Sequence, residues 1–127
     1  MPAYAAPAKD HGAYRTSAVL TASHGQLIVM LYDGARRFLH QAGVAMSEGQ
    51  ISLAHTKLTH AEEILRHLRA TLDMQQGQLP DRLNAIYTFS LDHLRRARIE
   101  QNPSKLEQVS EILGRLRDAW AAVADNG

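Results

Sequence analysis

The sequence predicts an all-α protein: an antiparallel up-down-up-down four-helix bundle at residues 21–127, with a mobile N-terminal arm or short capping segment at residues 1–20. Three observations predict this fold. Four stretches carry apolar residues at steps of three and four, start and stop signals bound each stretch, and the connections are about two to six residues long. Such connections cannot run back along a helix of roughly 30 Å, so consecutive helices must be antiparallel neighbours. We expect the helices at about 24–47, 51–75, 80–101 and 103–124.

The N-terminal arm lacks apolar periodicity. Residues 1 to about 13 combine two prolines and a glycine with small residues, a composition typical of a mobile arm. Tyr14, Val19 and Leu20 then precede the predicted helix start at Ser23. Leu20 is close enough to pack on the first turn as a hydrophobic staple. Tyr14 lies too far upstream to do so, and we expect it in an arm that covers part of the first helix.

The first helix begins at a capping box, in which the Ser23 hydroxyl and the Gln26 amide each satisfy a backbone N–H. Its core-facing seam consists of Leu27, Leu31, Gly34, Phe38, Ala42 and Ala45. Further apolar residues on other faces are Ile28, Val29, Met30, Tyr32, Ala35 and Leu39. They spread hydrophobic surface beyond the width of one seam, and neighbouring helices, the N-terminal segment or another protein must cover it.

Two glycines bound the second helix. Gly49 suits the left-handed position after the first helix, and Gly77 is the expected stop after the second. The seam of the second helix has a regular heptad spacing and consists of Ile51, Ala54, Leu58, Ala61, Leu65, Leu68 and Leu72. This spacing is typical of left-handed packing between nearly parallel helices.

Two prolines mark the starts of the last two helices. Pro80 suits a first turn because its missing N–H costs nothing there, and Asn102 is expected to cap a helix that begins at Pro103. The seam of the third helix is Leu83, Ile86, Tyr87, Ser90, Leu94 and Ala97. The seam of the fourth helix is Leu106, Val109, Leu113, Leu116, Trp120 and Val123.

The composition favours a cytosolic protein without nucleic-acid partners. The 14 Lys+Arg and 13 Asp+Glu give a formal charge of +1, so no global field attracts nucleic acid or an acidic membrane. Acidic residues also lie among the arginine clusters, which disfavours a nucleic-acid surface. The chain has no Cys, which excludes disulfides. The first residues do not resemble a secretion signal, and the apolar run from Leu27 to Tyr32 is far below the roughly 20 residues of a membrane span, so we expect no membrane insertion.

No motif in the sequence supports catalysis or a metal site. Di-iron bundles need Glu-x-x-His pairs, which the sequence lacks, and the nearest approach to a ligand pair is His60 with Glu63. Nucleotide-binding and hydrolase motifs do not occur either. We therefore expect no enzyme activity, no cofactor and no metal. Most charged residues fit outer helix faces, with i,i+4 pairs expected at Glu62–Arg66, Glu111–Arg115 and Asp92–Arg96.

Gly34 is unusual because it interrupts an otherwise strong helix. Glycine inside a helix costs roughly 1 kcal/mol relative to alanine, which indicates a close approach to the backbone at this point. A tight crossing with a neighbouring helix is the favoured interpretation. Passage of a bound peptide is the functional alternative.

Four stretches resemble the flagellar export chaperones of the FliS family. They are LIVMLYDGA at 27–35, LDMQQGQL at 72–79, LNAIYTFSLDHLRRA at 83–97 and LEQVSEILGRLRDAWA at 106–121. The resemblance implies a helical bundle that binds the disordered C-terminal segment of flagellin in the cytosol and prevents its premature polymerisation. It also implies delivery of flagellin to the export gate of the flagellar type III apparatus. In that family a tyrosine of the N-terminal arm, matched here by Tyr14, covers a hydrophobic groove or takes part in export contacts.

One stretch departs from the family pattern. Where the family usually reads Ser-Pro-(Glu/His)-Gln after the cap, this chain reads Ser23-His24-Gly25-Gln26. Without a proline at the first helical position, we expect a looser start to the first helix.

We therefore expect a non-enzymatic flagellin chaperone with a client-binding groove on the outer part of the first helix and on apolar residues of the other helices. The expected groove residues are Ile28, Leu31, Tyr32, Gly34, Ala35, Leu39, Ile64, Tyr87, Leu91 and Ile112. Tyr14, Val19 and Leu20 are the expected displaceable cap. The alternative is a structural, self-associating bundle whose extra apolar face forms a homodimer. As a chaperone, the free protein is expected to be a monomer or a weak homodimer.

Overall fold

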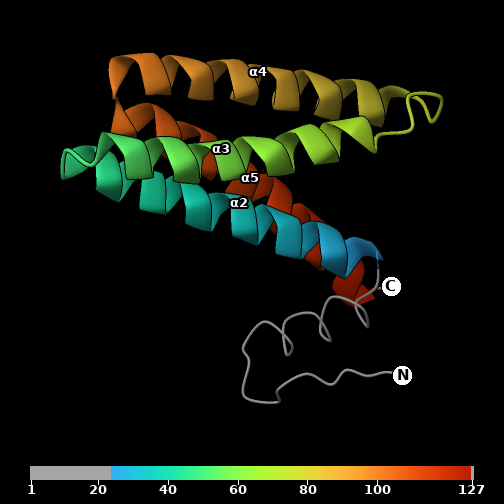
Figure 1. Cartoon of the computed structure of the whole chain (residues 1–127). Coiled ribbons are helices and arrows are strands. Elements are labelled where there is room, and N and C mark those ends of the chain that lie inside the picture. Colours follow the sequence, from blue (N-terminus) through green and yellow to red (C-terminus); the bar gives the residue numbers. More distant parts are fainter. Residues whose placement is uncertain (1–23, 127) are drawn as a thin grey trace, which may run out of the picture.

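The structure, a computed structural model, describes the backbone of residues 24–126 and the side chains of residues 24–124. Its helices are α2 (His24–Ser47), α3 (Ile51–Ala70), α4 (Gln78–Glu100) and α5 (Pro103–Asn126). Every regular element in this described part is a helix (Figure 1), which confirms the predicted all-α fold. The predicted capping residue Ser23 and the predicted cap residues Tyr14, Val19 and Leu20 lie outside the described residues.

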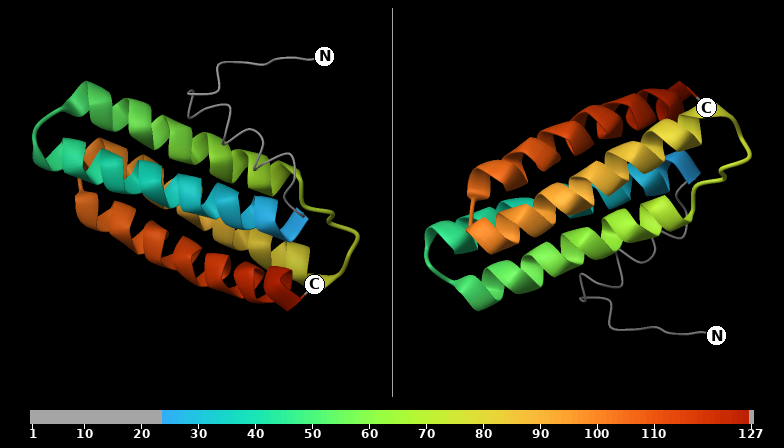
Figure 2. Two further views of the ribbon diagram at one scale, coloured as in Figure 1. Left: turned by 90° about the horizontal axis from the view of Figure 1, so that it is seen from below. Right: turned by 90° about the horizontal axis from the view of Figure 1, so that it is seen from above.

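The four helices run antiparallel and side by side (Figures 1 and 2). The start of α2, the α3–α4 connection and the end of α5 lie at one end of the bundle, and the two short turns lie at the other. Helix α2 packs closely along both α3 and α5, whereas α4 lies against α3 and α5 with fewer close approaches. The predicted up-down-up-down topology is confirmed.

Helix α2 ends as predicted, in a left-handed glycine. Gly49 has φ +74°, and its backbone N–H donates to the carbonyl of Met46 over 3.1 Å. The Gln50 N–H donates to the carbonyl of Ala45 over 2.8 Å. These two hydrogen bonds form a Schellman motif, which satisfies carbonyls that the helix end would otherwise leave unpaired.

Helix α3 ends at Ala70, five residues before the predicted end at residue 75. The Asp73 side chain accepts a hydrogen bond from the Gln75 backbone N–H over 3.1 Å, which is the geometry of an Asx turn. The Gln75 N–H therefore bonds to a nearby side chain and does not make the backbone hydrogen bond that a helix extending to residue 75 would require. Leu72 still packs against the hydrophobic core, although it lies outside the helix.

Helix α4 begins at Gln78, two residues before the predicted start at Pro80. Pro80 therefore lies third in the helix, where a backbone N–H would have no helical partner in any case. At the next boundary, the Asn102 side chain accepts from the Ser104 backbone N–H over 3.0 Å, and α5 starts at Pro103 as predicted.

The core lies along the bundle axis and contains the inward-facing residues of all four helices. Tyr32 and Tyr87 are 0% and 2% exposed, and their hydroxyl groups are hydrogen-bonded to each other between α2 and α4. Burial raises the pKa of both phenols. The other large, fully buried apolar side chains are Leu39, Leu58, Leu65, Leu68, Leu94, Leu106, Val109 and Leu113. Among residues 24–126, we find no helix with the length and apolar character needed to span a membrane.

Candidate functional site

A surface groove runs between α2 and α5, and we call it the α2–α5 groove. Its volume is about 580 Å³. The residues that line it are Arg36, Leu39, His40, Gly43, Val44, Ser47, Glu48, Pro103, Leu106, Glu107, Ser110 and Glu111. Those from α2 recur at steps of three and four residues, so the groove follows one helix face for about three turns, or roughly 16 Å.

Gly43 helps to keep the α2–α5 groove open. A Cβ atom at this position would come within 3.9 Å of both Leu106 and Pro103 on α5, and glycine leaves that space empty. Val44 beside it is 43% exposed, so it offers apolar surface at this point of the groove. The groove therefore offers apolar surface in its middle and charged groups toward its rim.

A second groove, which we call the end groove, lies where α2 begins and where α3 connects to α4. Its volume is about 320 Å³. Its lining residues are His24, Ile28, Leu68, Thr71, Leu72, Asp73, Gln76, Leu79, Pro80, Leu83, Tyr87 and Trp120. Leu79 is 62% exposed at this end of the bundle. Apolar side chains thus dominate the walls of this groove.

The structure buries half of the predicted groove residues, although two of these five still line a groove. Tyr32 and Ala35 are fully buried, and Gly34 is buried as well. Leu39 and Tyr87, at 1% and 2% exposure, form only the floors of the two grooves. The reason is that α3 and α5 both flank α2, so they cover a wider arc of its apolar surface than one seam would.

The other five predicted groove residues lie nearer the surface. Ile28 is half-buried and lines the end groove. The remaining four are half-buried and line neither groove: Leu31, Ile64, Leu91 and Ile112. The structure thus brings Ile28 and Tyr87 together in one groove, but it does not gather the predicted set into a single site.

Several groove residues were missed in the sequence. Gly43 and Val44 of α2 face Pro103 and Leu106 of α5 across the α2–α5 groove. Gly43 carried a usable signal, because glycine within a helix indicates either a close approach or an open space. Trp120 was assigned to the core seam and does pack against the core, but it also lines the end groove, which periodicity alone does not show.

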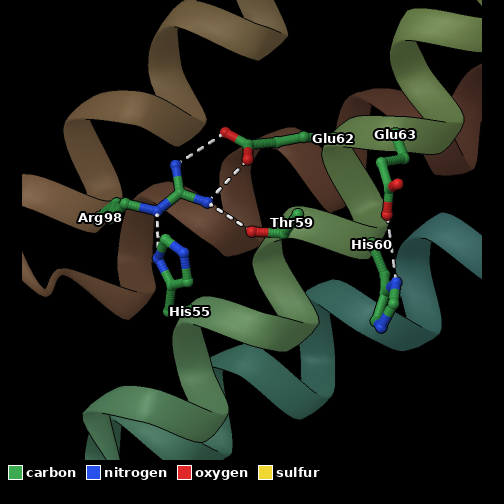
Figure 3. A network of polar contacts seen from close by, with 6 residues as sticks. All are labelled: His55, Thr59, His60, Glu62, Glu63 and Arg98. Atoms are coloured by element: carbon green, nitrogen blue, oxygen red, sulfur yellow. Dashed lines mark hydrogen bonds and ion pairs between the residues drawn. The ribbon is translucent and has the colours of Figure 1, made fainter.

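A partly buried polar network joins α3 to α4 (Figure 3). The Arg98 guanidinium donates to both carboxylate oxygens of Glu62, over 2.7 and 2.9 Å. It also donates to His55 Nδ1 over 3.1 Å and to the Thr59 hydroxyl over 3.3 Å. The predicted pair between Glu62 and Arg66 is therefore wrong, because the Glu62 side chain points to the neighbouring helix.

Two other predicted ion pairs are present on the outer faces. Asp92 and Arg96 are 3.1 Å apart, and Glu111 and Arg115 are 4.0 Å apart. Exposed pairs of this kind contribute little to folding and carry no functional signal.

The polar residues that the structure describes do not assemble a metal site. No group of three or more His, Cys, Asp or Glu side chains gathers in that part of the chain in an arrangement that could hold an ion. His60 Nδ1 lies 3.2 Å from a carboxylate oxygen of Glu63, on an exposed face of α3 (Figure 3).

Comparison with known proteins identifies the family. The family model of flagellar protein FliS matches residues 7–127. The flagellar secretion chaperone FliS of Salmonella typhimurium (strain LT2) is 30% identical over 110 residues, covering 85% of this chain and 82% of that protein. The same-named protein of Bacillus subtilis (strain 168) is 30% identical over 108 residues, covering 85% and 80%. That of Escherichia coli (strain K12) is 31% identical over 106 residues, covering 82% and 78%.

A solved structure described as a flagellar chaperone from bacteria has the same fold. It superposes with a TM-score of 0.77 at 13% sequence identity, covering 91% of this chain and 98% of that one. Since the family match extends over nearly the whole sequence and the relatives align over most of their own length, this chain belongs to the FliS family of flagellar proteins.

Proposed function

We propose that this protein is a cytosolic export chaperone that binds the disordered C-terminal segment of flagellin. It would prevent premature polymerisation of flagellin and help to deliver it to the export gate of the flagellar type III apparatus. The family match over residues 7–127 is the observation that carries this proposal. The chaperone name of the relatives implies a role in binding, so we propose no enzymatic activity.

The two grooves are the surfaces that we propose for the client. A disordered segment that folds on binding can lay an amphipathic helix into an apolar groove. Burial of apolar surface would favour binding by about 25 cal/mol per Å², and the ordering of the client chain would oppose it. Val44 in the α2–α5 groove and Leu79 in the end groove are the exposed apolar side chains on which this contact would depend.

We propose further that the segment containing Tyr14, Val19 and Leu20 covers the end groove when no client is bound. Leu20 lies four residues before His24, which lines that groove. The segment is therefore close enough along the chain to reach the groove. Binding of the client would then displace it.

Calorimetric titration with a peptide of the flagellin C-terminal segment from the same bacterium tests the proposal. We expect saturable 1:1 binding with a negative heat-capacity change, because the client buries apolar surface. The N-terminal segment of the same flagellin is the control and is expected not to bind. Absence of heat and of any spectral change at tens of micromolar, the range of a weak complex, would reject the proposal.

Substitutions in the grooves show which one the client uses. Val44→Asp places a charge in the α2–α5 groove, and Leu79→Asp places one in the end groove. Leu53→Asp is the matched control, because Leu53 is 44% exposed on α3 and lines neither groove. We expect at least one of the groove substitutions to weaken binding and the control to leave it unchanged.

Sedimentation velocity at low micromolar concentration tests the alternative of a self-associating bundle. The chaperone proposal predicts a monomer or a weak homodimer when the protein is free. A tight dimer that excludes the flagellin peptide would favour the structural alternative instead.

A further inference from the structure

The guanidinium of Arg36 lies at one end of the α2–α5 groove, where it contacts Ser110 and Gly114 of α5. Its Nε donates to the hydroxyl of Ser110 over 3.2 Å. Gly114, one turn further along α5, leaves the room that the guanidinium occupies. A Cβ atom at Gly114 would lie only 3.0 Å from Arg36 Cζ and 3.1 to 3.2 Å from its two terminal nitrogens. Arg36 is therefore held in a defined place rather than extended into solvent.

Arg36 differs from two other half-buried arginines, Arg98 and Arg117, which pair with acids. Arg98 pairs with Glu62 and Arg117 pairs with Asp33, each within 3.0 Å. Among residues 24–124, no carboxylate lies within 4.0 Å of Arg36, and its hydrogen bond to Ser110 uses Nε alone. The four N–H donors of its terminal nitrogens are thus without a protein partner in that part of the chain.

The groove beside Arg36 is apolar in the middle and acidic at the far end. Leu106 and Val44 line the middle, and Glu107 and Glu48 lie further from Arg36. Glu111 also lines the groove, beside Ser110 at the Arg36 end, but it is paired with Arg115 over 4.0 Å. In the described part of the chain, neither Glu107 nor Glu48 has a cation within 4.0 Å. A ligand complementary to this pattern carries an acid at one end, an apolar stripe, and a base at the other end.

We propose that Arg36 anchors an aspartate or glutamate side chain of the client segment that lies in the α2–α5 groove. This inference rests on the proposed function and names the group that sets its specificity. A guanidinium that is held in position and has unpaired terminal N–H groups can donate two parallel hydrogen bonds to a carboxylate.

The test measures the affinity of the full-length protein for the flagellin C-terminal peptide by calorimetry. Arg36→Gln is expected to weaken binding about tenfold, since it removes a charge-assisted contact. Arg37→Gln is the matched control: it removes the same charge from the next residue, which is exposed and lines neither groove, and it is expected to change affinity less than about twofold.

A second pair of variants tests whether the position of the Arg36 guanidinium against Gly114 matters for binding. Gly114→Ala places a Cβ against the guanidinium and is expected to reduce affinity toward that of Arg36→Gln. Gly34→Ala is its control, because a Cβ there meets only Ile64 and Arg37 at ordinary contact distances of 3.6 and 3.8 Å. Unfolding curves of all four variants show whether any loss of binding reflects a loss of the fold.

A peptide series identifies the acid. Each Asp or Glu of the peptide is changed in turn to Asn or Gln, and binding is measured against wild-type protein and Arg36→Gln. We expect one position whose change weakens binding to the wild type but not to the variant, and an amidated C-terminus should have no effect.

The outcomes separate this inference from the proposed function. If the wild-type protein fails to bind the unmodified peptide, the proposed function itself is wrong. If it binds and Arg36→Gln binds equally well, the function stands and the anchor is wrong. Coupling of Arg36 to C-terminal amidation, or to no acidic position, would likewise overturn the assignment to an acidic side chain.

Discussion

Arg98 of α4 and Glu62 of α3 form a bidentate ion pair in which the Glu62 carboxylate is buried. The two hydrogen bonds measure 2.7 and 2.9 Å, and the side chains of Arg98 and Glu62 are 25% and 6% exposed. Thr59 and His55 accept the remaining hydrogen bonds of the guanidinium. Because α4 approaches its neighbours less closely than α2 does, this network is a principal polar link between α4 and the rest of the bundle.

Arg98→Met is expected to destabilise the fold strongly. It leaves the Glu62 carboxylate buried without a partner, a change that typically costs about 3 to 5 kcal/mol of unfolding free energy. Urea unfolding followed by circular dichroism measures the loss. The double variant Arg98→Met with Glu62→Leu should recover much of it, because no unpaired charge remains. Asp92→Asn, in an exposed pair, is the control and should hardly move the midpoint. Equal effects of Arg98→Met and Asp92→Asn would contradict the role of burial.

The tyrosine pair in the core predicts a loss of stability in alkaline solution. Burial raises the pKa of Tyr87 and of Tyr32 above the ordinary value of 10.0, although hydrogen bonds with Tyr87 and Trp120 partly offset the rise for Tyr32. Above about pH 10 the unfolded chain loses these protons while the folded chain keeps them. The unfolded state then binds fewer protons, so stability is complete below pH 10 and falls as pH rises. Tyr87 alone contributes a slope of about 1.4 kcal/mol per pH unit.

The measurement compares urea unfolding at pH 8, 10 and 11 for the wild type and for the double variant Tyr32→Phe with Tyr87→Phe. Other groups titrate equally in both proteins, so the difference in slope isolates the two phenols. We expect the double variant to lose stability less steeply above pH 10. Parallel curves would show that neither phenol retains its proton in the folded state.

The sequence predicted the parts of this fold that depend on local rules. Asn102 and Pro103 define the start of α5 because capping and the missing proline N–H act within a few residues. The heptad spacing of the second helix predicted the buried residues from Ala54 to Leu68, although Ile51 is 61% exposed. It did not reveal that the helix ends at Ala70, before the Asp73 turn. Periodicity reports which residues prefer burial, whereas a side chain that bonds nearby backbone competes with the helix.

The site was harder to predict because it depends on which parts of each helix surface the neighbouring helices cover. Tyr32 and Ala35 were expected on an exposed face, and the two helices that flank α2 bury them. Likewise, the i,i+4 rule assigned Glu62 to a residue of its own helix, since a single sequence does not show that α4 brings Arg98 to it. Periodicity describes one helix at a time, and both the grooves and the buried pair arise between helices.

Asn102→Ala is expected to lower the unfolding free energy by about 1 kcal/mol, because it leaves the backbone N–H of Ser104 without its cap. Asn102→Asp is the matched control, since its carboxylate keeps the acceptor and also suits the positive end of the helix dipole. Urea midpoints of the three proteins provide the comparison. An alanine variant as stable as the wild type would show that water replaces the cap without loss.

Gly34→Ala is expected to stabilise the protein without changing its affinity for a client. Removing glycine from a helix interior gains about 1 kcal/mol, and the new Cβ would meet the Ile64 side chain at an ordinary 3.6 Å. Gly34 is buried and lines neither groove, so we expect no client to pass over it. Gly49→Ala is the contrasting variant: its surroundings are open, yet its φ of +74° strains any residue with a Cβ, so stability should fall by about 1 kcal/mol. A Gly34→Ala protein that is more stable but binds flagellin peptide weakly would instead support a peptide passage at this position.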